Sequence, residues 1–118
     1  MFKSYEDAAT YLAEHKIPMV DLKFSDLWGR WHHITISAAN FCSDIMKCGV
    51  GFDGSSVGFK SVHSGDMVLV PDLTTGFLDP FWDTPTLSFI CNTLEADTKK
   101  PFPFEPREIA RHAEAHMQ

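Results

Sequence analysis

The sequence predicts one α+β domain, with a mixed or antiparallel sheet of about five strands and a helix packed on one face. Three observations support this class. The 118 residues are 44% hydrophobic and 13% aromatic, which suits one modest core. Segments with a helical period lie near both ends of the chain. Between them lie short strand-like segments separated by turn residues, a pattern typical of hairpins.

The first predicted element is a helix over residues 5–15. Ser4 precedes it as a candidate N-cap, and Pro18 prevents the helix from continuing further. The apolar or small side chains of this segment recur at helical spacing, at Tyr5, Ala8, Ala9, Leu12 and Ala13.

A β-hairpin and a short helix are predicted next. Residues 19–27 alternate in part between apolar and polar side chains, and residues 31–36 supply the returning strand. Trp28-Gly29-Arg30 between them has the composition of a turn. Residues 37–48 predict a short helix or helical turn, and Gly49 follows where a C-terminal cap glycine is common.

The segment after this helix predicts a loop and two strands. Residues 51–66 are rich in turn residues, whereas residues 67–71 are strand-like. A turn at residues 73–76 would then lead into a further strand over residues 77–82. Pro80 indicates that this strand lies at an edge or breaks there.

The last segments are a strand, a linker and a helix. Residues 86–94 have the strongest strand composition, residues 98–106 form a linker rich in Lys, Pro and Phe, and residues 108–117 predict a helix. The predicted order is therefore α-β-β-α-β-β-β-α. Both a β-grasp and a ferredoxin-like arrangement fit this order, and the pattern alone does not choose between them.

The composition excludes several classes of protein. A net charge of −6 and a pI near 5.4 argue against a general surface for nucleic acid or anionic membranes. No apolar run reaches the ~20 residues that span a bilayer, and the acidic N-terminal residues are not a signal peptide. Cys42, Cys48 and Cys91 are odd in number and lack C-x-x-C spacing, so we expect reduced thiols in a cytoplasmic protein.

The histidines do not predict a metal site. His32 and His33 are neighbours in a predicted strand, so they face opposite sides of it. His112 and His116 share one face of the last helix, but two imidazoles fall short of the three or four ligands that zinc needs. We therefore expect the second pair on a solvated face and no metal ligands in this chain.

Residues 51–66 hold the densest group of candidate functional side chains. Asp53-Gly54-Ser55-Ser56 brings a carboxylate and two hydroxyls into the middle of this loop. These are also ordinary turn residues, because Gly allows positive φ while Asp and Ser bond to nearby backbone. The residues alone therefore favour a structural loop. Arg30 and Lys60 are the cations available for a phosphate contact, although solvated turn charges are the simpler interpretation.

Three segments together resemble the N-terminal domain of class I, or bacterial-type, glutamine synthetases. They are F-D-G-S-S at residues 52–56, D-M-V-L-V-P-D at 66–72 and F-L-D-P-F at 77–81. Their order and spacing make the resemblance specific, and it covers nearly the whole chain. It implies a β-grasp, or ubiquitin-like, domain over residues 1–100, followed by a linker and first helix over residues 101–118 that lead toward a catalytic domain.

The resemblance also implies roles for residues of the loop. The family aspartate that matches Asp53 reaches the active site of a neighbouring subunit, where it binds ammonium and takes a proton from it. The ammonia so produced attacks γ-glutamyl phosphate, and a positioned carboxylate base suits this step. Ser56, Phe59 and Asp66 match positions that hold this loop or lie near the site. A local structural role stays open for Ser56 and Asp66.

For the full-length protein, the resemblance implies an ATP-dependent glutamate–ammonia ligase that uses Mg²⁺ or Mn²⁺. Its partners would be its own C-terminal catalytic domain and neighbouring subunits of a homo-oligomer, a dodecamer of stacked rings. In the family, the metal-binding glutamates, the nucleotide site and the glutamate-binding arginines lie in the larger downstream domain. This chain alone is therefore expected to be inactive and to bind no cofactor.

Two alternatives stay open. Many family members have two glycines and a tryptophan after the serines, where this chain has Val57-Gly58-Phe59. That departure allows a ligase that joins glutamate to an amine other than ammonia, although the retained D-G-S-S favours ammonia. The other alternative is a non-catalytic interaction module with a ubiquitin-like fold, which the acidic, motif-poor composition permits.

Overall fold

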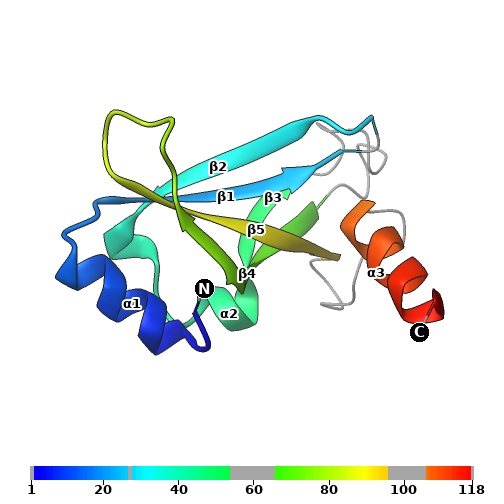
Figure 1. Cartoon of the computed structure of the whole chain (residues 1–118), viewed down its shortest axis with the longest axis horizontal. Helices are drawn as coiled ribbons and strands as arrows, with labels where there is room; N and C mark the ends of the chain where they lie inside the picture. Colours follow the sequence, from blue (N-terminus) through cyan, green and yellow to red (C-terminus); the bar gives the residue numbers. More distant parts are fainter. Residues whose placement is uncertain (1, 27, 54–65, 96–105, 118) are drawn as a thin grey trace.

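The computed structural model describes residues 2–26, 28–53, 66–95 and 106–117. Its centre is a five-stranded sheet in the order β2-β1-β5-β4-β3 (Figure 1). Strand β5 is the middle strand and runs parallel to β1, and every other neighbouring pair is antiparallel. The predicted mixed sheet of five strands is therefore confirmed. The strands are β1 (Met19–Ser25), β2 (Trp31–Ser37), β3 (Val50–Asp53), β4 (Asp66–Leu78) and β5 (Thr86–Glu95).

The hydrophobic core lies between one face of this sheet and the helices that cover it. Helix α1 (Tyr5–Glu14) and the short helix α2 (Ile45–Cys48) lie on that face, and a 3-10 turn, η1 (Ala38–Asn40), precedes α2 (Figure 1). Alternate positions of the central strands supply most of the buried apolar side chains, as a period of two requires. The core members of β1 and β5 are Val20, Leu22, Phe24, Leu87, Phe89 and Cys91.

Helix α1 forms much as its sequence predicts. The Ser4 hydroxyl accepts a hydrogen bond from the Asp7 N–H at 3.3 Å, which satisfies one of the free donors of the first turn. Ala8 and Leu12 lie one turn apart and are both buried against the sheet. The chain leaves the helix through Lys16, which has a φ of 53°.

The prediction of two strands at residues 67–71 and 77–82 with a turn between them is wrong. A single strand, β4, runs from Asp66 to Leu78, and its register with β5 shifts between Asp72 and Phe77. A threonine hydroxyl explains why the strand does not turn away: the Thr75 Oγ1 donates to the Asp72 carbonyl at 2.7 Å and accepts from the Ile90 N–H at 2.9 Å. Thr75 thus holds the irregular segment against β5.

The interpretation of Pro80 as a point where the strand breaks is confirmed, because β4 ends at Leu78. Pro80 lies after the end of β4, in the turn that leads to β5, rather than within a strand. The Asp79 N–H donates to the Thr86 carbonyl at 2.9 Å and closes this connection. The predicted order of element types is nevertheless correct, because a short strand that was not predicted, β3, replaces the strand that is missing.

Strand β3 lies where only a loop was predicted. It follows Gly49, which has a φ of 71° and ends α2 as expected. A Cβ at this position would lie 2.9 Å from both the Leu69 carbonyl oxygen and the Val68 Cβ, so the glycine also allows the chain to pass close to β4. The tight approach starts the antiparallel pairing of β3 with β4.

Candidate functional site

The two predicted site aspartates that the structure describes lie opposite each other at one end of the sheet. Asp53 is the last residue of β3 and Asp66 is the first residue of β4, and they are partners in the antiparallel register. Asp66 is exposed. The segment from 54 to 65, which includes Ser56, Phe59 and Lys60, lies outside the described residues, as does the side chain of Asp53. The roles predicted for these residues therefore stay predictions.

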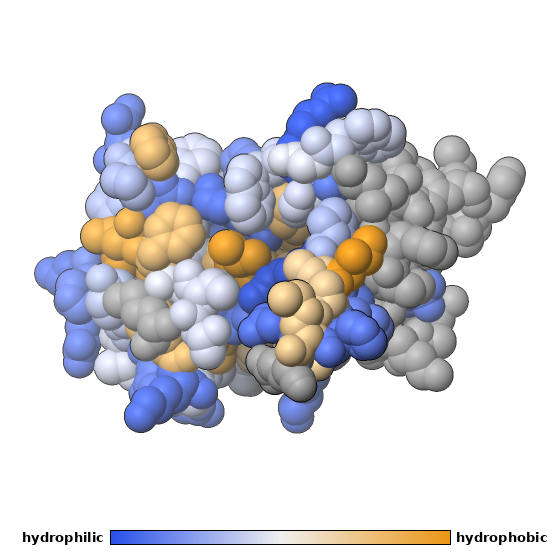
Figure 2. Space-filling view, turned by 45° about the vertical axis from the view of Figure 1, so that its right-hand side comes forward, coloured by the Kyte–Doolittle hydropathy of each residue, from blue (hydrophilic) through white to orange (hydrophobic). Residues whose placement is uncertain are grey.

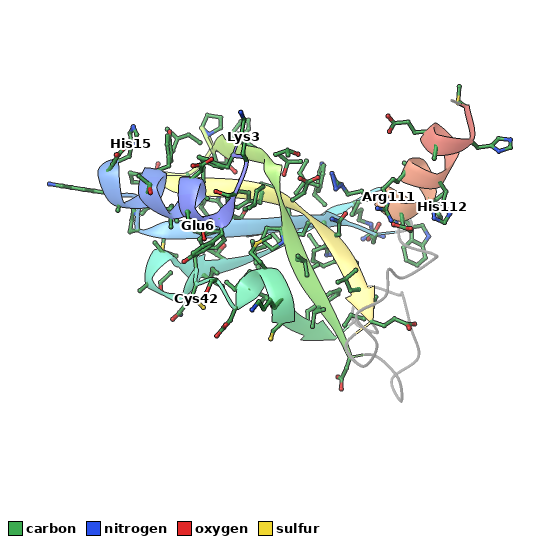
Figure 3. All side chains as sticks on the ribbon, turned by 90° about the horizontal axis from the view of Figure 1, so that it is seen from below. Lys3, Glu6, His15, Cys42, Arg111 and His112 are labelled. Atoms are coloured by element: carbon green, nitrogen blue, oxygen red, sulfur yellow. The ribbon has the colours of Figure 1, made fainter. Side chains whose placement is uncertain are left out.

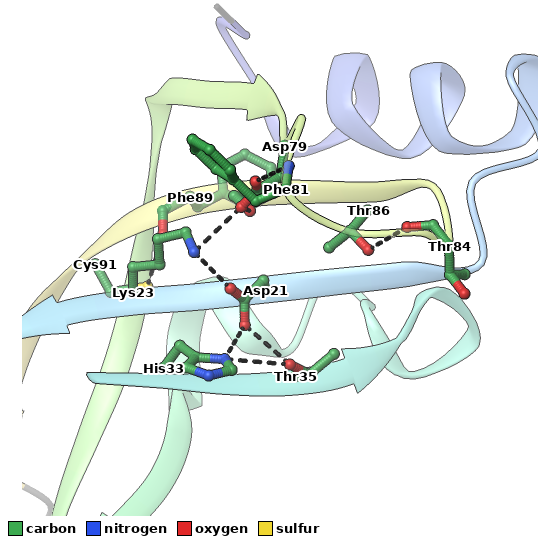
Figure 4. A network of polar contacts seen from close by, with 11 residues as sticks. Asp21, Lys23, His33, Thr35, Asp79, Phe81, Thr84, Thr86, Phe89 and Cys91 are labelled. Atoms are coloured by element: carbon green, nitrogen blue, oxygen red, sulfur yellow. Dashed lines mark hydrogen bonds and ion pairs between the residues drawn. The ribbon is translucent and has the colours of Figure 1, made fainter. Parts of the chain in front are cut away.

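The sheet face that lies away from the core carries a connected polar network (Figure 4). Asp21, on β1, is completely buried and uses both of its carboxylate oxygens. Its Oδ1 lies 2.8 Å from the His33 Nδ1 and accepts from the Thr35 hydroxyl at 2.9 Å. Its Oδ2 accepts from the Lys23 ammonium at 2.8 Å. The network therefore links β1 with the neighbouring edge strand, β2.

Lys23 extends this network to the connection between β4 and β5. Its ammonium nitrogen lies 3.2 Å from the Asp79 Oδ2, which also accepts from the Ser88 hydroxyl at 2.8 Å. The other Asp79 oxygen accepts from the Phe81 N–H at 3.0 Å. One lysine thus neutralises two buried carboxylates that come from separate parts of the chain, as buried charges require.

The network shifts the pKa values of two of its groups. Burial lowers the pKa of Lys23, but hydrogen bonds and charge attraction from Asp21 and Asp79 outweigh it and hold the pKa above its usual range. Burial raises the pKa of Asp79, but hydrogen bonds from Phe81, Ser88 and Lys23 outweigh this effect and hold the pKa below its usual range. Both groups are therefore charged near neutral pH.

A third buried aspartate, Asp26, organises the tip of the β1–β2 hairpin. The Asp26 Oδ1 accepts from the N–H groups of Trp28 and Arg30, both at 2.9 Å, and its Oδ2 lies 2.8 Å from the His32 Nε2. The hydrogen bond to His32, with those from the two backbone groups, outweighs burial and lowers the pKa of Asp26. Gly29 has a φ of 80°, as the predicted turn requires.

A hollow of about 310 Å³ lies above the Lys23 network. Phe81 is 92% exposed and Trp31 is 62% exposed, so the walls of the hollow present aromatic rings to solvent. Figure 2 shows apolar groups interspersed with hydrophilic ones over the face that it presents, rather than one continuous apolar surface. The residues around the hollow are Lys23, Trp31, His32, His33, Phe77, Asp79, Phe81 and Ile90.

Comparison with known proteins decides the family. Residues 16–96 match the family model described as the glutamine synthetase beta-Grasp domain, and this range covers more than half of the chain. The chain belongs to this family. The β-grasp fold and the resemblance to glutamine synthetases are therefore both confirmed.

Curated relatives of this glutamine synthetase domain extend over almost the whole chain. The glutamine synthetase of Azorhizobium caulinodans is 38% identical over 117 residues, and that of Escherichia coli K12 is 40% identical over 116 residues. A protein named 3-hydroxylaminophenol mutase, from Cupriavidus pinatubonensis, is 36% identical over 119 residues. These matches cover 98 to 100% of the chain but only 25% of each relative, so the chain spans about a quarter of their length.

Solved structures support the same fold. A Plasmodium falciparum glutamine synthetase matches with a TM-score of 0.86 at 16% identity, over 98% of this chain and 23% of that chain. A structure described as a GmaS/ADP complex matches with a TM-score of 0.82 at 22% identity, over 93% of this chain and 25% of that chain. At these identities the likeness concerns the fold alone.

The described part of this glutamine synthetase domain does not fit a metal ion. Among residues 2–26, 28–53, 66–95 and 106–117, no group of three or more His, Cys, Asp or Glu side chains is placed to hold one. His32 and His33 bind different aspartates, and His112 pairs with Glu108 and is exposed on the last helix, as expected for a solvated face. Within the same residues, no helix is long and apolar enough to cross a membrane.

Sequence reasoning missed the polar network of Asp21, Lys23 and Asp79. A signal for the first two was present, because V-D-L-K-F alternates apolar and charged side chains and so predicts one charged face of a strand. No local signal connects Asp79 with them, since 56 residues separate it from Lys23 in the sequence and only the parallel pairing of β1 with β5 brings them together. Arg30 is exposed at the hairpin tip, in agreement with a solvated turn charge.

Proposed function

We propose that the chain is the N-terminal domain of a glutamate–ammonia ligase, a glutamine synthetase located in the cytoplasm. Residues 1–100 form the domain, and residues 101–118 lead toward a larger catalytic domain. The family match and the 38 to 40% identity to bacterial glutamine synthetases over almost the whole chain support this proposal. The metal and ATP would bind outside this chain, whose described residues offer no metal cluster. The chain alone would then be inactive.

In this proposal, Asp53 works in the active site of a neighbouring subunit of a homo-oligomer, a dodecamer as the family resemblance implies. Its carboxylate attracts ammonium and accepts a proton, so that neutral ammonia attacks the activated glutamate. The observation in favour is the place of Asp53 at the end of β3, opposite Asp66 at the start of β4. Loops held at both ends by a sheet are common sites of catalytic groups.

The test is a biosynthetic assay of the full-length protein with ATP, glutamate and ammonium. Asp53→Asn keeps the size of the side chain and removes its charge, so turnover should fall by about 10²-fold or more. Asp44→Asn, at an exposed aspartate before α2, is the matched control and should leave turnover unchanged. Normal turnover of the Asp53 variant at ordinary ammonium concentrations would contradict its catalytic role.

A different acceptor remains the second candidate. The mutase among the relatives bears a name that denotes another reaction, although its identity to this chain is nearly as high. The departure at Val57-Gly58-Phe59 falls in the segment proposed to face the acceptor. The same assay with a series of primary amines in place of ammonium separates the two candidates, because only an amine ligase would release phosphate with an amine and not with ammonium.

A further inference from the structure

Helix α3 (Pro106–Met117) lies at the opposite end of the molecule from α1 (Figures 1 and 3). It buries very little apolar surface. Glu108 is its only buried residue, whereas Ile109 is 50% exposed and Met117 is 86% exposed. Because tertiary packing of an apolar face is what usually stabilises a short helix in a protein, α3 needs another kind of contact to fix its position.

Arg107 supplies that contact. Its Nη2 donates to the Asp72 Oδ2 on β4 at 2.7 Å, and its Nη1 donates to the Asn92 Oδ1 on β5 at 3.0 Å. One planar guanidinium therefore bridges two neighbouring strands, which a lysine could not do in the same geometry. A hollow of about 380 Å³ remains beside these residues, bordered also by Ala110, Arg111 and Glu114. The helix is thus bridged to the sheet rather than packed on it.

The irregular part of β4 prepares Asp72 for this bridge. The Asp72 Oδ1 accepts from the Thr74 N–H at 3.1 Å and from the Thr74 hydroxyl at 2.7 Å. The Oδ2 is therefore the oxygen that accepts the hydrogen bond from Arg107. Asp72 lies at the start of the register shift in β4, and its carboxylate is held by Thr74. Arg107 therefore donates to an acceptor whose orientation is already fixed.

We propose that Arg107 is a positioning residue that fixes the direction of α3 relative to β4 and β5. Strand β4 also begins at Asp66, which lies six residues before Asp72 and therefore about 20 Å along the same strand. Any domain that follows α3 would then be held at a defined angle to the end of the sheet that carries Asp53. This catalytic consequence rests on the proposed function, whereas the bridge itself does not.

The first test measures amide hydrogen exchange by NMR in the 118-residue chain. The bridge is only partly buried, so Arg107→Ala should reduce the protection of α3 amides by about two- to fivefold and leave the β1 and β5 amides unchanged. Arg111→Ala is the matched control, because Arg111 pairs with Glu108 within the same helix. Asp72→Asn should produce part of this loss, because the Arg107 contact to Asn92 remains, and the double variant should lose little more than Arg107→Ala alone.

Protection of α3 that is unchanged in Arg107→Ala, or reduced equally in Arg111→Ala, would overturn the proposal.

The second test measures glutamine formation by the full-length protein. Because a misplacement of about 1 Å is costly in catalysis, Arg107→Ala should lower kcat about tenfold or more while the KM for ATP stays unchanged. Arg107→Lys should keep part of this activity, and Arg111→Ala should keep all of it.

Equal kcat values for Arg107→Ala and Arg111→Ala would contradict the catalytic consequence. If the wild-type full-length protein forms no glutamine at all, the proposed function fails instead. The exchange experiment then still decides whether Arg107 positions α3, since it requires no activity.

Discussion

At the scale of single residues, Lys23 is a cation that joins two buried carboxylates. It lies between Asp21, which is completely buried, and Asp79, which is nearly so. Each carboxylate also accepts hydrogen bonds from other groups, but of the residues that the structure describes only Lys23 contacts both. Removal of the cation would leave two buried negative charges, one on β1 and one in the connection between β4 and β5, without their main compensating charge.

We therefore expect Lys23→Met to destabilise the fold. Because the lysine side chain still reaches solvent, the free energy of unfolding should fall by about 2 kcal/mol, less than the cost of breaking a fully buried pair. Urea denaturation followed by tryptophan fluorescence measures this change. Lys47→Met, at an exposed lysine of α2, is the control and should have little effect. Equal losses in the two variants would show that the network does not stabilise the fold.

At the scale of elements, β3 and the unbroken length of β4 could not be predicted from the sequence. The helix α1 and the hairpin of β1 and β2 were predictable because their caps, turn residues and alternation are local signals. Strand β3 has only four residues, two of them Gly51 and Asp53, which are poor strand formers. It forms because β4 lies beside it, and Thr75 keeps β4 whole across a segment that resembles a turn. Both effects depend on neighbouring strands.

A pair of glycine variants tests this view of β3. Gly49→Ala places a Cβ against Leu69 and Val68 at a residue of positive φ, so it should cost about 1–3 kcal/mol of stability. Gly51→Ala is the control, since a Cβ there meets no atom within 4 Å and φ is not positive. Thermal unfolding of both variants measures the difference. A loss that is no greater at Gly49 than at Gly51 would show that the close approach is not required.

At the scale of the whole molecule, the sequence was sufficient for the fold class but not for the network across the open sheet face. The family segments at residues 52–56 and 66–72 indicated the β-grasp fold, and the comparisons confirm it. Lys23 and Asp79 could not be paired beforehand, because their contact depends on which strands become neighbours. The bridge from Arg107 to Asp72 was hidden for the same reason, since 35 residues separate its partners.

The stability of the whole chain should depend on pH in a defined sense. The pKa values of Asp26 and Asp79 are lowered on folding, so their contribution is present above about pH 4 and is lost as the pH falls through their folded values. The pKa of Lys23 is raised on folding, so its contribution is present below about pH 10 and is lost as the pH rises through its folded value. Stability should therefore fall at both extremes.

Chemical denaturation at a series of pH values measures this profile. Asp79→Asn should be less stable at pH 7 and should lose less additional stability in acid than the wild type, because one of the two shifted carboxylates is gone. Asp83→Asn, at an exposed aspartate in the same connection, is the control and should keep the wild-type profile. An unchanged acid slope in Asp79→Asn would contradict the assignment.

The three thiols differ in exposure, so their reaction with an alkylating reagent can report the opening of the sheet. Cys42 and Cys48 are exposed, whereas Cys91 is completely buried on the central strand β5, where burial raises the pKa of its thiol. A protonated thiol that reagents cannot reach does not alkylate. Each molecule should thus gain two added masses quickly and the third only when β5 separates from its neighbours. The rate at which the third mass appears, followed by mass spectrometry of samples alkylated for increasing times, would then measure how often β5 becomes accessible.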